Sequence, residues 1–154
     1  MAIMQSAGVS YVAEARDEAG ELLGYDIDPP LTQSAYDVVA EEVQRAQLLG
    51  YAAAARYRKE TGGISVAGQP IATDRESQAL ISGAFALVQQ QPQTVIRFKT
   101  PGGFVTLDAA QMSAIAIAVA QHVQACFALE ADVAADITSG EIITPAEIDA
   151  AFAA

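Results

Sequence analysis

The sequence predicts an α+β fold in which helices pack on small antiparallel β-hairpins. Short alternating segments flank tight turns at three places, helix-capping patterns follow these segments, and long Ala-rich stretches lie between them. The expected order is hairpin, helix, hairpin, helix, hairpin, helix, with a short helix at the C-terminal end. The 154 residues are enough for one domain with an appended arm.

The first predicted element is a β-hairpin between Val9 and Ile27. Apolar and polar residues alternate on both sides of the turn at residues 17–20, as they do in strands with one buried face. Asp28-Pro29-Pro30 then breaks the pattern, because proline has no amide proton and restricts the residue before it. We therefore interpret residues 1–30 as an N-terminal hairpin arm and linker.

The first predicted helix begins at a cap formed by Thr32 or Ser34 and runs to about Glu60. Acidic residues lie early in this stretch and basic residues lie late, which suits the helix dipole at both ends. Gly62 and Gly63 are expected to end the helix. This helix opens the predicted core domain, residues 31–140.

A second hairpin is predicted from residues 64–66 and 71–72, around the turn Ala67-Gly68-Gln69-Pro70. Thr73-Asp74-Arg75-Glu76 follows as a capping box, in which the Thr73 hydroxyl and the Glu76 carboxylate would satisfy free amides at the start of a helix. This helix should run to about Gln91, because Pro92 stops it.

The same unit recurs 35 positions later, with strands at residues 94–99 and 104–107 around Thr100-Pro101-Gly102-Gly103. Asp108-Ala109-Ala110-Gln111 then caps the third helix, which Gly140 closes. An internal duplication or a repeated, economical design would both give this spacing. Thr144-Pro145-Ala146-Glu147 caps a short last helix within residues 141–154.

The charge of the chain is strongly acidic but unevenly distributed. The formal net charge of −11 comes from −7 in residues 1–50, +3 in residues 51–107 and −7 in residues 108–154. This balance disfavours nucleic acid and anionic membranes as partners, since both attract Lys and Arg. The central basic residues could meet an acidic partner or the acidic ends of the chain itself, and we favour the second: Arg56, Arg58, Lys59, Arg75, Arg97 and Lys99.

The chain's one histidine and one cysteine, His122 and Cys126, lie four residues apart on the predicted third helix and therefore share a face. A nucleophilic Cys-His pair would also need an oxyanion hole and an orienting group, and a metal site would need further ligands. Asp26 and Asp28 begin like a calcium loop, but Leu31 replaces the required glycine. We therefore expect no catalytic, cofactor or metal site.

The apolar spacing of the third helix offers a structural explanation for the same two residues. Positions three and four apart form a seam typical of a bundle helix or of a symmetric oligomer: Met112, Ile115, Val119, His122, Cys126, Leu129 and Val133. Polar residues interrupt residues 109–129, and no Lys or Arg follows Lys99 to anchor a membrane span. With no signal-peptide pattern at the N-terminus, we expect a soluble protein.

Three segments resemble a domain of unknown function that occurs in tail-fibre assembly proteins of tailed bacteriophages and prophages. They are ETGGISVAGQPIATDRESQALISGA, FKTPGGFVTLDAAQ and HVQACFALEADV, and the resemblance covers roughly half to two-thirds of the chain. It implies a non-enzymatic protein, acting in the bacterial host cytoplasm during assembly, that engages a tail-fibre or baseplate component. Such a protein is either an assembly chaperone or a part that remains on the virion.

Residues 1–60 resemble the family less clearly, and we expect a partner-specific role there. Tyr11 and Tyr25 on the predicted arm are the candidate partner contacts, because a tyrosine ring buries area while its hydroxyl tolerates water. One alternative is a permanent, multi-copy virion subunit whose third helix packs around a trimer axis. A remote alternative is a Cys-His enzyme, which would require an exposed, reactive Cys126.

Overall fold

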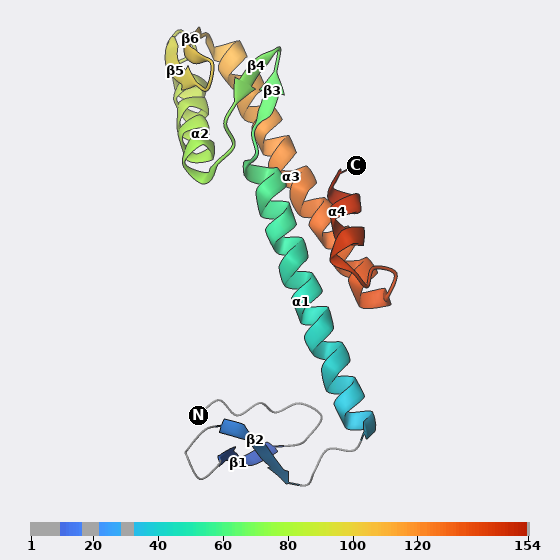
Figure 1. Ribbon diagram of the computed structural model, residues 1–154. Helices are drawn as coiled ribbons and strands as arrows, with labels where there is room; N and C mark the ends of the chain where they lie inside the picture. Colours follow the sequence, from blue (N-terminus) through green and yellow to red (C-terminus); the bar gives the residue numbers. More distant parts are fainter. Residues whose placement is uncertain (1–9, 17–21, 29–32, 154) are drawn as a thin grey trace. The chain divides into compact units, whose positions relative to one another are not determined.

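A computed structural model describes residues 10–16, 22–28 and 33–153 of the chain (Figure 1). It divides into two compact units, residues 1–47 and residues 48–154, with the boundary inside helix α1, Gln33–Thr61. The predicted α+β class and the order of the elements are confirmed, and the described strands form three separate two-stranded antiparallel sheets.

The first unit contains the predicted N-terminal hairpin, formed by β1, Ser10–Arg16, and β2, Leu22–Asp28. The strands pair antiparallel, and the register shifts between Tyr11 and Ala13 and again between Ala15 and Arg16. The proposed cap Thr32 and the linker prolines lie outside the described residues. In the described part of α1 that belongs to this unit, residues 34–47, every side chain is exposed or half-buried.

The second unit begins with the C-terminal half of α1, followed by a short hairpin. Strands β3, Ile64–Val66, and β4, Gln69–Ile71, are joined by the two-residue turn Ala67-Gly68. Both turn residues have positive φ, 49° and 80°, which matches the twist of a tight hairpin. Gly63, also at positive φ, lets the chain leave α1 where a Cβ atom would lie 3.2 Å from a backbone oxygen.

Helix α2, Arg75–Gln90, starts one residue later than the sequence predicted, and its cap is different. The N-cap is Asp74, whose carboxylate accepts a hydrogen bond from the Ser77 amide at 3.0 Å. The predicted capping role of Thr73 is therefore wrong. Its side chain is fully buried and bonds the end of α1 instead, so the neighbouring aspartate serves as the cap.

The third hairpin and the last two helices form where the turn and capping residues of the sequence predicted them. Strands β5, Ile96–Thr100, and β6, Gly103–Leu107, lead into α3, Ala109–Ser139. The predicted capping box of Asp108 and Gln111 is present, and Gly140 ends α3 in the left-handed conformation with φ 83°. Glu147 of α4, Pro145–Ala153, accepts from the Thr144 amide at 2.9 Å, as the sequence predicted.

Helix α3 connects two hydrophobic cores of the second unit. One core contains α2, the β3–β4 and β5–β6 hairpins and the first half of α3, while the other joins the second half of α3 to α1 and α4 (Figure 1). The apolar seam predicted on α3 is buried or half-buried within the chain itself. In the described part of the chain, α3 is the one helix long and apolar enough to cross a membrane.

Candidate functional site

The most polar buried place in the second unit surrounds Glu60, near the C-terminal end of α1. Its side chain is 0 % exposed. A guanidinium nitrogen of Arg56 donates to one carboxylate oxygen, and Nη2 of Arg75 lies 3.2 Å from that oxygen and 3.1 Å from the other. Gln78 donates its side-chain amide to the second oxygen at 3.1 Å. Three donors from α1 and α2 thus satisfy one buried carboxylate.

Arg56 extends this cluster to α3. Its Nε donates to Glu130 Oε2 at 2.8 Å, and its guanidinium lies 4.5 Å from the centroid of the Phe127 ring. The Arg56 side chain is only 14 % exposed. A half-buried arginine with two carboxylates and an aromatic ring is well compensated, since each group contacts a different part of the guanidinium. We call Arg56, Glu60, Arg75, Gln78 and Glu130 the Glu60 cluster.

Thr73 fixes the backbone next to this cluster. Its hydroxyl donates to the Glu60 carbonyl at 2.6 Å and accepts from the Gly63 amide at 2.9 Å. Gln78 also donates to the Thr73 carbonyl at 2.7 Å. These bonds satisfy backbone groups that the end of a helix leaves unpaired. The cluster therefore holds the end of α1 and the start of α2 together.

The electrostatics of the cluster favour the charged form of Glu60. Burial alone would raise the pKa of this carboxyl, but the hydrogen bonds from Gln78 and Arg56 and the charge of Arg75 outweigh it, so the pKa lies below its ordinary value. For Arg56, burial acts to lower the pKa, while Glu130 and Glu60 raise it above the ordinary value. Both groups are held ionised as partners.

His122 and Cys126 lie beside the cluster, and their geometry differs from that of a nucleophilic pair. His122 Nε2 lies 3.1 Å from the Lys59 carbonyl and 3.2 Å from the Glu60 carbonyl. Carbonyl oxygens only accept hydrogen bonds, so Nε2 must carry the proton and cannot remove one from Cys126, whose sulfur is 3.8 Å away. Cys126 is 1 % exposed, and burial raises the pKa of its thiol.

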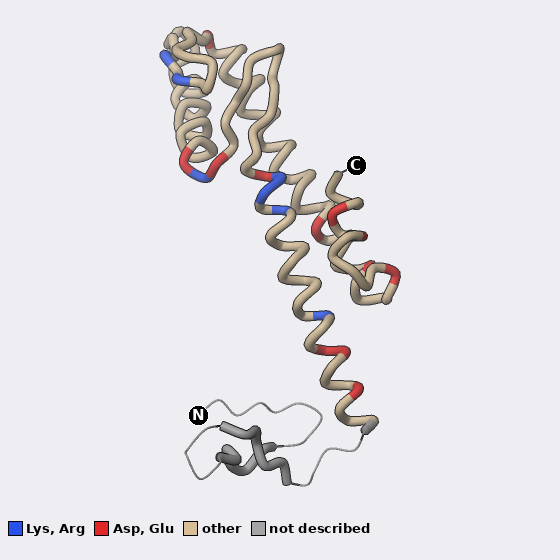
Figure 2. The backbone as a smooth tube through the Cα atoms, in the orientation of Figure 1, with Lys and Arg blue, Asp and Glu red and all other residues tan. Residues whose placement is uncertain are grey.

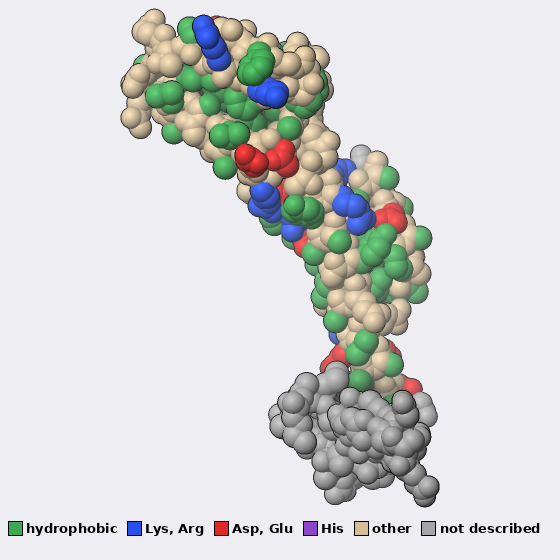
Figure 3. All heavy atoms as spheres, turned by 60° about the vertical axis from the view of Figure 1, so that its left-hand side comes forward, with side chains coloured by type: hydrophobic (Ala, Val, Ile, Leu, Met, Phe, Trp, Pro, Cys, Tyr) green, Lys and Arg blue, Asp and Glu red, His purple; other side chains and the backbone are tan. Residues whose placement is uncertain are grey.

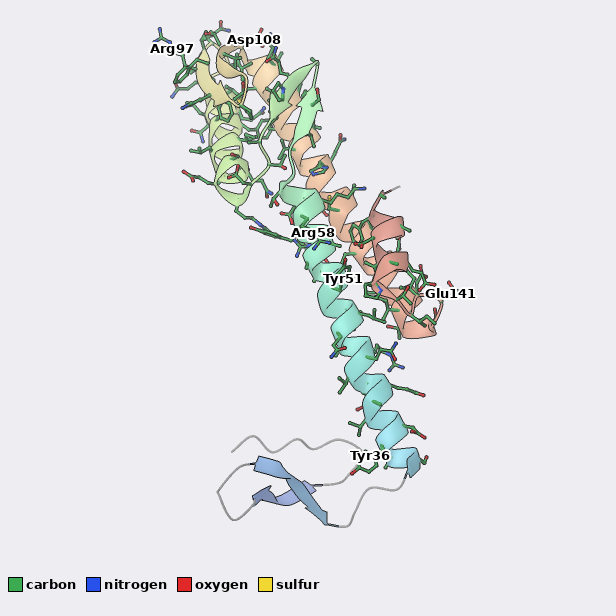
Figure 4. The ribbon with its side chains drawn as sticks, in the orientation of Figure 1. Tyr36, Tyr51, Arg58, Arg97, Asp108 and Glu141 are labelled. Carbon is green, nitrogen blue, oxygen red and sulfur yellow. The ribbon has the colours of Figure 1, made fainter. Side chains whose placement is uncertain are left out.

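A second polar contact ties α1 to the C-terminal helix. The Tyr51 hydroxyl lies 2.8 Å and 2.9 Å from the two carboxylate oxygens of Asp149, and Arg58 lies 3.7 Å from the same group. Tyr51 and Arg58 both come from α1 (Figure 4). Lys59 donates to the Phe152 carbonyl at 2.7 Å. Hydrogen bonding to Asp149 raises the pKa of Tyr51. Figure 2 shows basic residues gathered near the C-terminal end of α1.

These contacts explain four of the six basic residues between positions 51 and 107. Arg56, Arg58 and Arg75 pair with carboxylates of the chain, and Lys59 bonds a carbonyl. Arg56 and Arg58 pair with the acidic C-terminal segment through Glu130 and Asp149, as the preferred hypothesis expected, whereas Arg75 pairs with Glu60 inside the central segment itself. The sequence analysis did not predict that Glu60 would be buried with charged partners. Its position directly after Arg58-Lys59, as an acidic residue in a basic stretch, was the signal that could have indicated it.

The described residues also contain an open groove of about 400 Å³ beside the end of α1. It is lined by residues 61–65 and 70–72 and by Pro101, without an acidic or basic side chain. Among the residues that the structure describes, no group of three or more His, Cys, Asp or Glu side chains could hold a metal ion.

The predicted contact residues Tyr11 and Tyr25 lie on β1 and β2. Their backbones pair with Ile27 and Glu14 respectively, so the two tyrosines are not partners in the strand register. Their side chains lie outside what the structure describes. The role of these two tyrosines stays a prediction.

Comparison with curated proteins and with solved structures gives no match. A family described as "Domain of unknown function (DUF4376)" matches residues 43–153. The match includes most of α1 and every later element, and hence the whole Glu60 cluster. Because it spans well over half of the sequence, the chain belongs to the DUF4376 family.

Proposed function

We propose that this protein is a non-enzymatic bacteriophage protein that associates with the tail fibre or baseplate and binds a tail-fibre component during assembly. The observation that carries the proposal is the resemblance of three segments within residues 60–133 to the domain found in tail-fibre assembly proteins. The match to the DUF4376 family over residues 43–153 covers the same part of the chain. Its place of action would be the bacterial host cytoplasm.

The use of the polar residues supports a binding role. The charged groups of the Glu60 cluster bond one another, and His122 bonds two carbonyls, so these groups are engaged in holding elements together. A rigid second unit built in this way suits a protein that presents surfaces to a partner. Tyr11 and Tyr25 on the N-terminal hairpin remain the first candidates for the fibre contact.

The experiment is mass spectrometry of purified virions and of the lysate from the phage or induced prophage that encodes the chain. Presence in the lysate and absence from virions supports a transient assembly factor. A fixed copy number relative to the fibre supports the alternative, a permanent multi-copy tail subunit. The proposal fails if the chain neither enters virions nor co-purifies with a fibre protein from the lysate.

The contact residues are tested separately in the full chain. Tyr11→Ala/Tyr25→Ala should lose co-purification with the fibre component while the helical circular dichroism signal is retained. Tyr51→Ala, which removes a tyrosine that already bonds Asp149, is the matched control and should retain binding. Equal fibre binding by the double variant and the wild type would exclude the arm as the contact.

A further inference from the structure

Two basic residues of the central segment form no ion pair within the part of the chain that the structure describes. Arg97 and Lys99 lie at alternate positions on β5, both side chains are exposed, and neither takes part in an ion pair with another described residue. The four other basic residues of this segment are all engaged internally. The second unit therefore displays positive charge at this hairpin, although the chain as a whole carries −11.

The register of the hairpin places an aromatic side chain beside these charges. Lys99 pairs with Phe104 and Arg97 with Thr106 across the two strands. The Phe104 side chain is 80 % exposed, and Lys99 Nζ lies 5.7 Å from the centroid of its ring. The alternate residues of both strands face the core, including Ile96 and Leu107. We call Arg97, Lys99, Phe104 and Thr106 the β5–β6 face.

The figures show that this face is open to solvent. In Figure 4 the Arg97 side chain points away from the ribbon at the end of the second unit that carries the hairpins. In Figure 3 two basic side chains lie close to an exposed hydrophobic one at the same end. Val95, immediately before β5, adds a further exposed apolar side chain at 59 %. Arginine and aromatic residues are the types that most often dominate the energy of a protein interface.

Charge decides the chemistry of the partner. An exposed phenylalanine offers an apolar anchor, and the two cations beside it complement carboxylates. Nucleic acid could also use cations and an aromatic ring, but its binding is driven by many Lys and Arg contacts with phosphates, and β5 offers only Arg97 and Lys99. We propose that the β5–β6 face is a docking surface for an acidic segment of another protein that carries an aliphatic or aromatic anchor residue. This surface is distinct from the Tyr11 and Tyr25 arm, and it does not require the partner to be a tail fibre.

The test uses the full-length chain as bait for a displayed library of random short peptides. Selection on the wild type, with depletion on Arg97→Gln/Lys99→Gln, should enrich peptides that combine Asp or Glu with an apolar anchor. Fluorescence anisotropy of an enriched peptide should then show binding that is about tenfold weaker or more for Arg97→Gln/Lys99→Gln, because each lost charged contact contributes on that scale. A similar loss is expected for Phe104→Ala.

Two matched variants control for general effects of charge and apolarity. Arg58→Gln removes an exposed cation that already pairs with Asp149, and Leu80→Ala removes an exposed apolar side chain of α2. Both should bind the peptide as the wild type does. Since all the substituted side chains of the face are exposed, unchanged circular dichroism is expected for every variant.

Several results would overturn the proposal. Enrichment of peptides without acidic residues would do so, as would equal peptide binding by the wild type and by both β5–β6 variants, Arg97→Gln/Lys99→Gln and Phe104→Ala. Tighter, Arg97-dependent binding of a labelled single-stranded oligothymidylate would assign the face to nucleic acid. Dimerisation abolished by Arg97→Gln/Lys99→Gln, without any selected peptide, would assign the face to a second copy of this chain.

Discussion

Replacement of Glu60 by Ala tests whether the buried charges hold the second unit together. The substitution leaves Arg56 buried with one carboxylate in place of two, because the Glu130 contact at 2.8 Å remains. Gln78 keeps its bond to the Thr73 carbonyl, and Arg75, whose side chain is 55 % exposed, can turn to water. Breaking a buried ion pair from one side costs about 3–5 kcal/mol. We expect about 3 kcal/mol here, since Glu130 compensates part of the Arg56 charge.

The free energy of unfolding is measured by urea denaturation, followed by the helical circular dichroism signal. A loss of about 3 kcal/mol at an unchanged denaturant dependence would be a large part of the stability of a domain of this size. Arg75→Gln is the matched control, because it removes an exposed partner of the same carboxylate and should cost no more than about 1 kcal/mol. Equal losses for the two variants would refute a central role for Glu60.

The pH dependence gives a second, independent test of the same cluster. The pKa of Glu60 is lowered in the folded chain, so its contribution to stability is present above the ordinary glutamate pKa of about 4.3 and is lost as the pH falls through the lower folded value. Glu60→Gln lacks this titration. The difference in unfolding free energy between the wild type and Glu60→Gln should therefore shrink on acidification. A difference that stays constant would contradict the assigned pKa direction.

Further predictions concern single positions. Ala67→Gly should raise the unfolding free energy by about 0.5 kcal/mol, because Ala67 has a positive φ of 49°, which glycine adopts more easily. Gly140→Ala should lower the unfolding free energy by about 1 kcal/mol, because Gly140 has φ 83°. Urea denaturation measures both changes, and changes of the same sign would contradict the assigned turns. Thr73→Val should cost about 1–3 kcal/mol because the buried hydroxyl makes two hydrogen bonds, while Thr73→Ser should recover most of this loss. Cys126 should react with iodoacetamide only slowly until the chain is denatured, and rapid native labelling would revive the Cys-His hypothesis.

Local signals in the sequence predicted the elements well, because capping and tight turns depend on residues a few positions apart. The boxes at Asp108 and Thr144 formed as predicted for this reason. At Thr73 and Asp74 two adjacent residues could each act as the cap, and the choice depended on a contact with the end of α1, far earlier in the chain. No local pattern contains that information.

The Glu60 cluster could not be predicted for the same reason. Its partners lie on three helices, and their meeting depends on how those helices pack. The spacing of apolar residues identified which face of α3 is used. The spacing did not reveal what covers this face. Met112 and Val133 are covered by other elements of the same chain, whereas the sequence also allowed a symmetric oligomer. The spacing of apolar residues indicates which face of a helix is buried, but not whether the same chain or another chain covers that face.

The extent of the family match separates the two proposed surfaces. Residues 43–153 include the Glu60 cluster and the β5–β6 face, whereas Tyr11 and Tyr25 lie before them. A contact made by the β5–β6 face thus belongs to the shared domain, and a contact made by the arm belongs to this chain's own N-terminal segment. Combining Tyr11→Ala/Tyr25→Ala with Arg97→Gln/Lys99→Gln in the full chain distinguishes two arrangements. Independent losses of fibre and peptide binding indicate two partners or two sites, whereas a joint loss from either change indicates one partner that spans both.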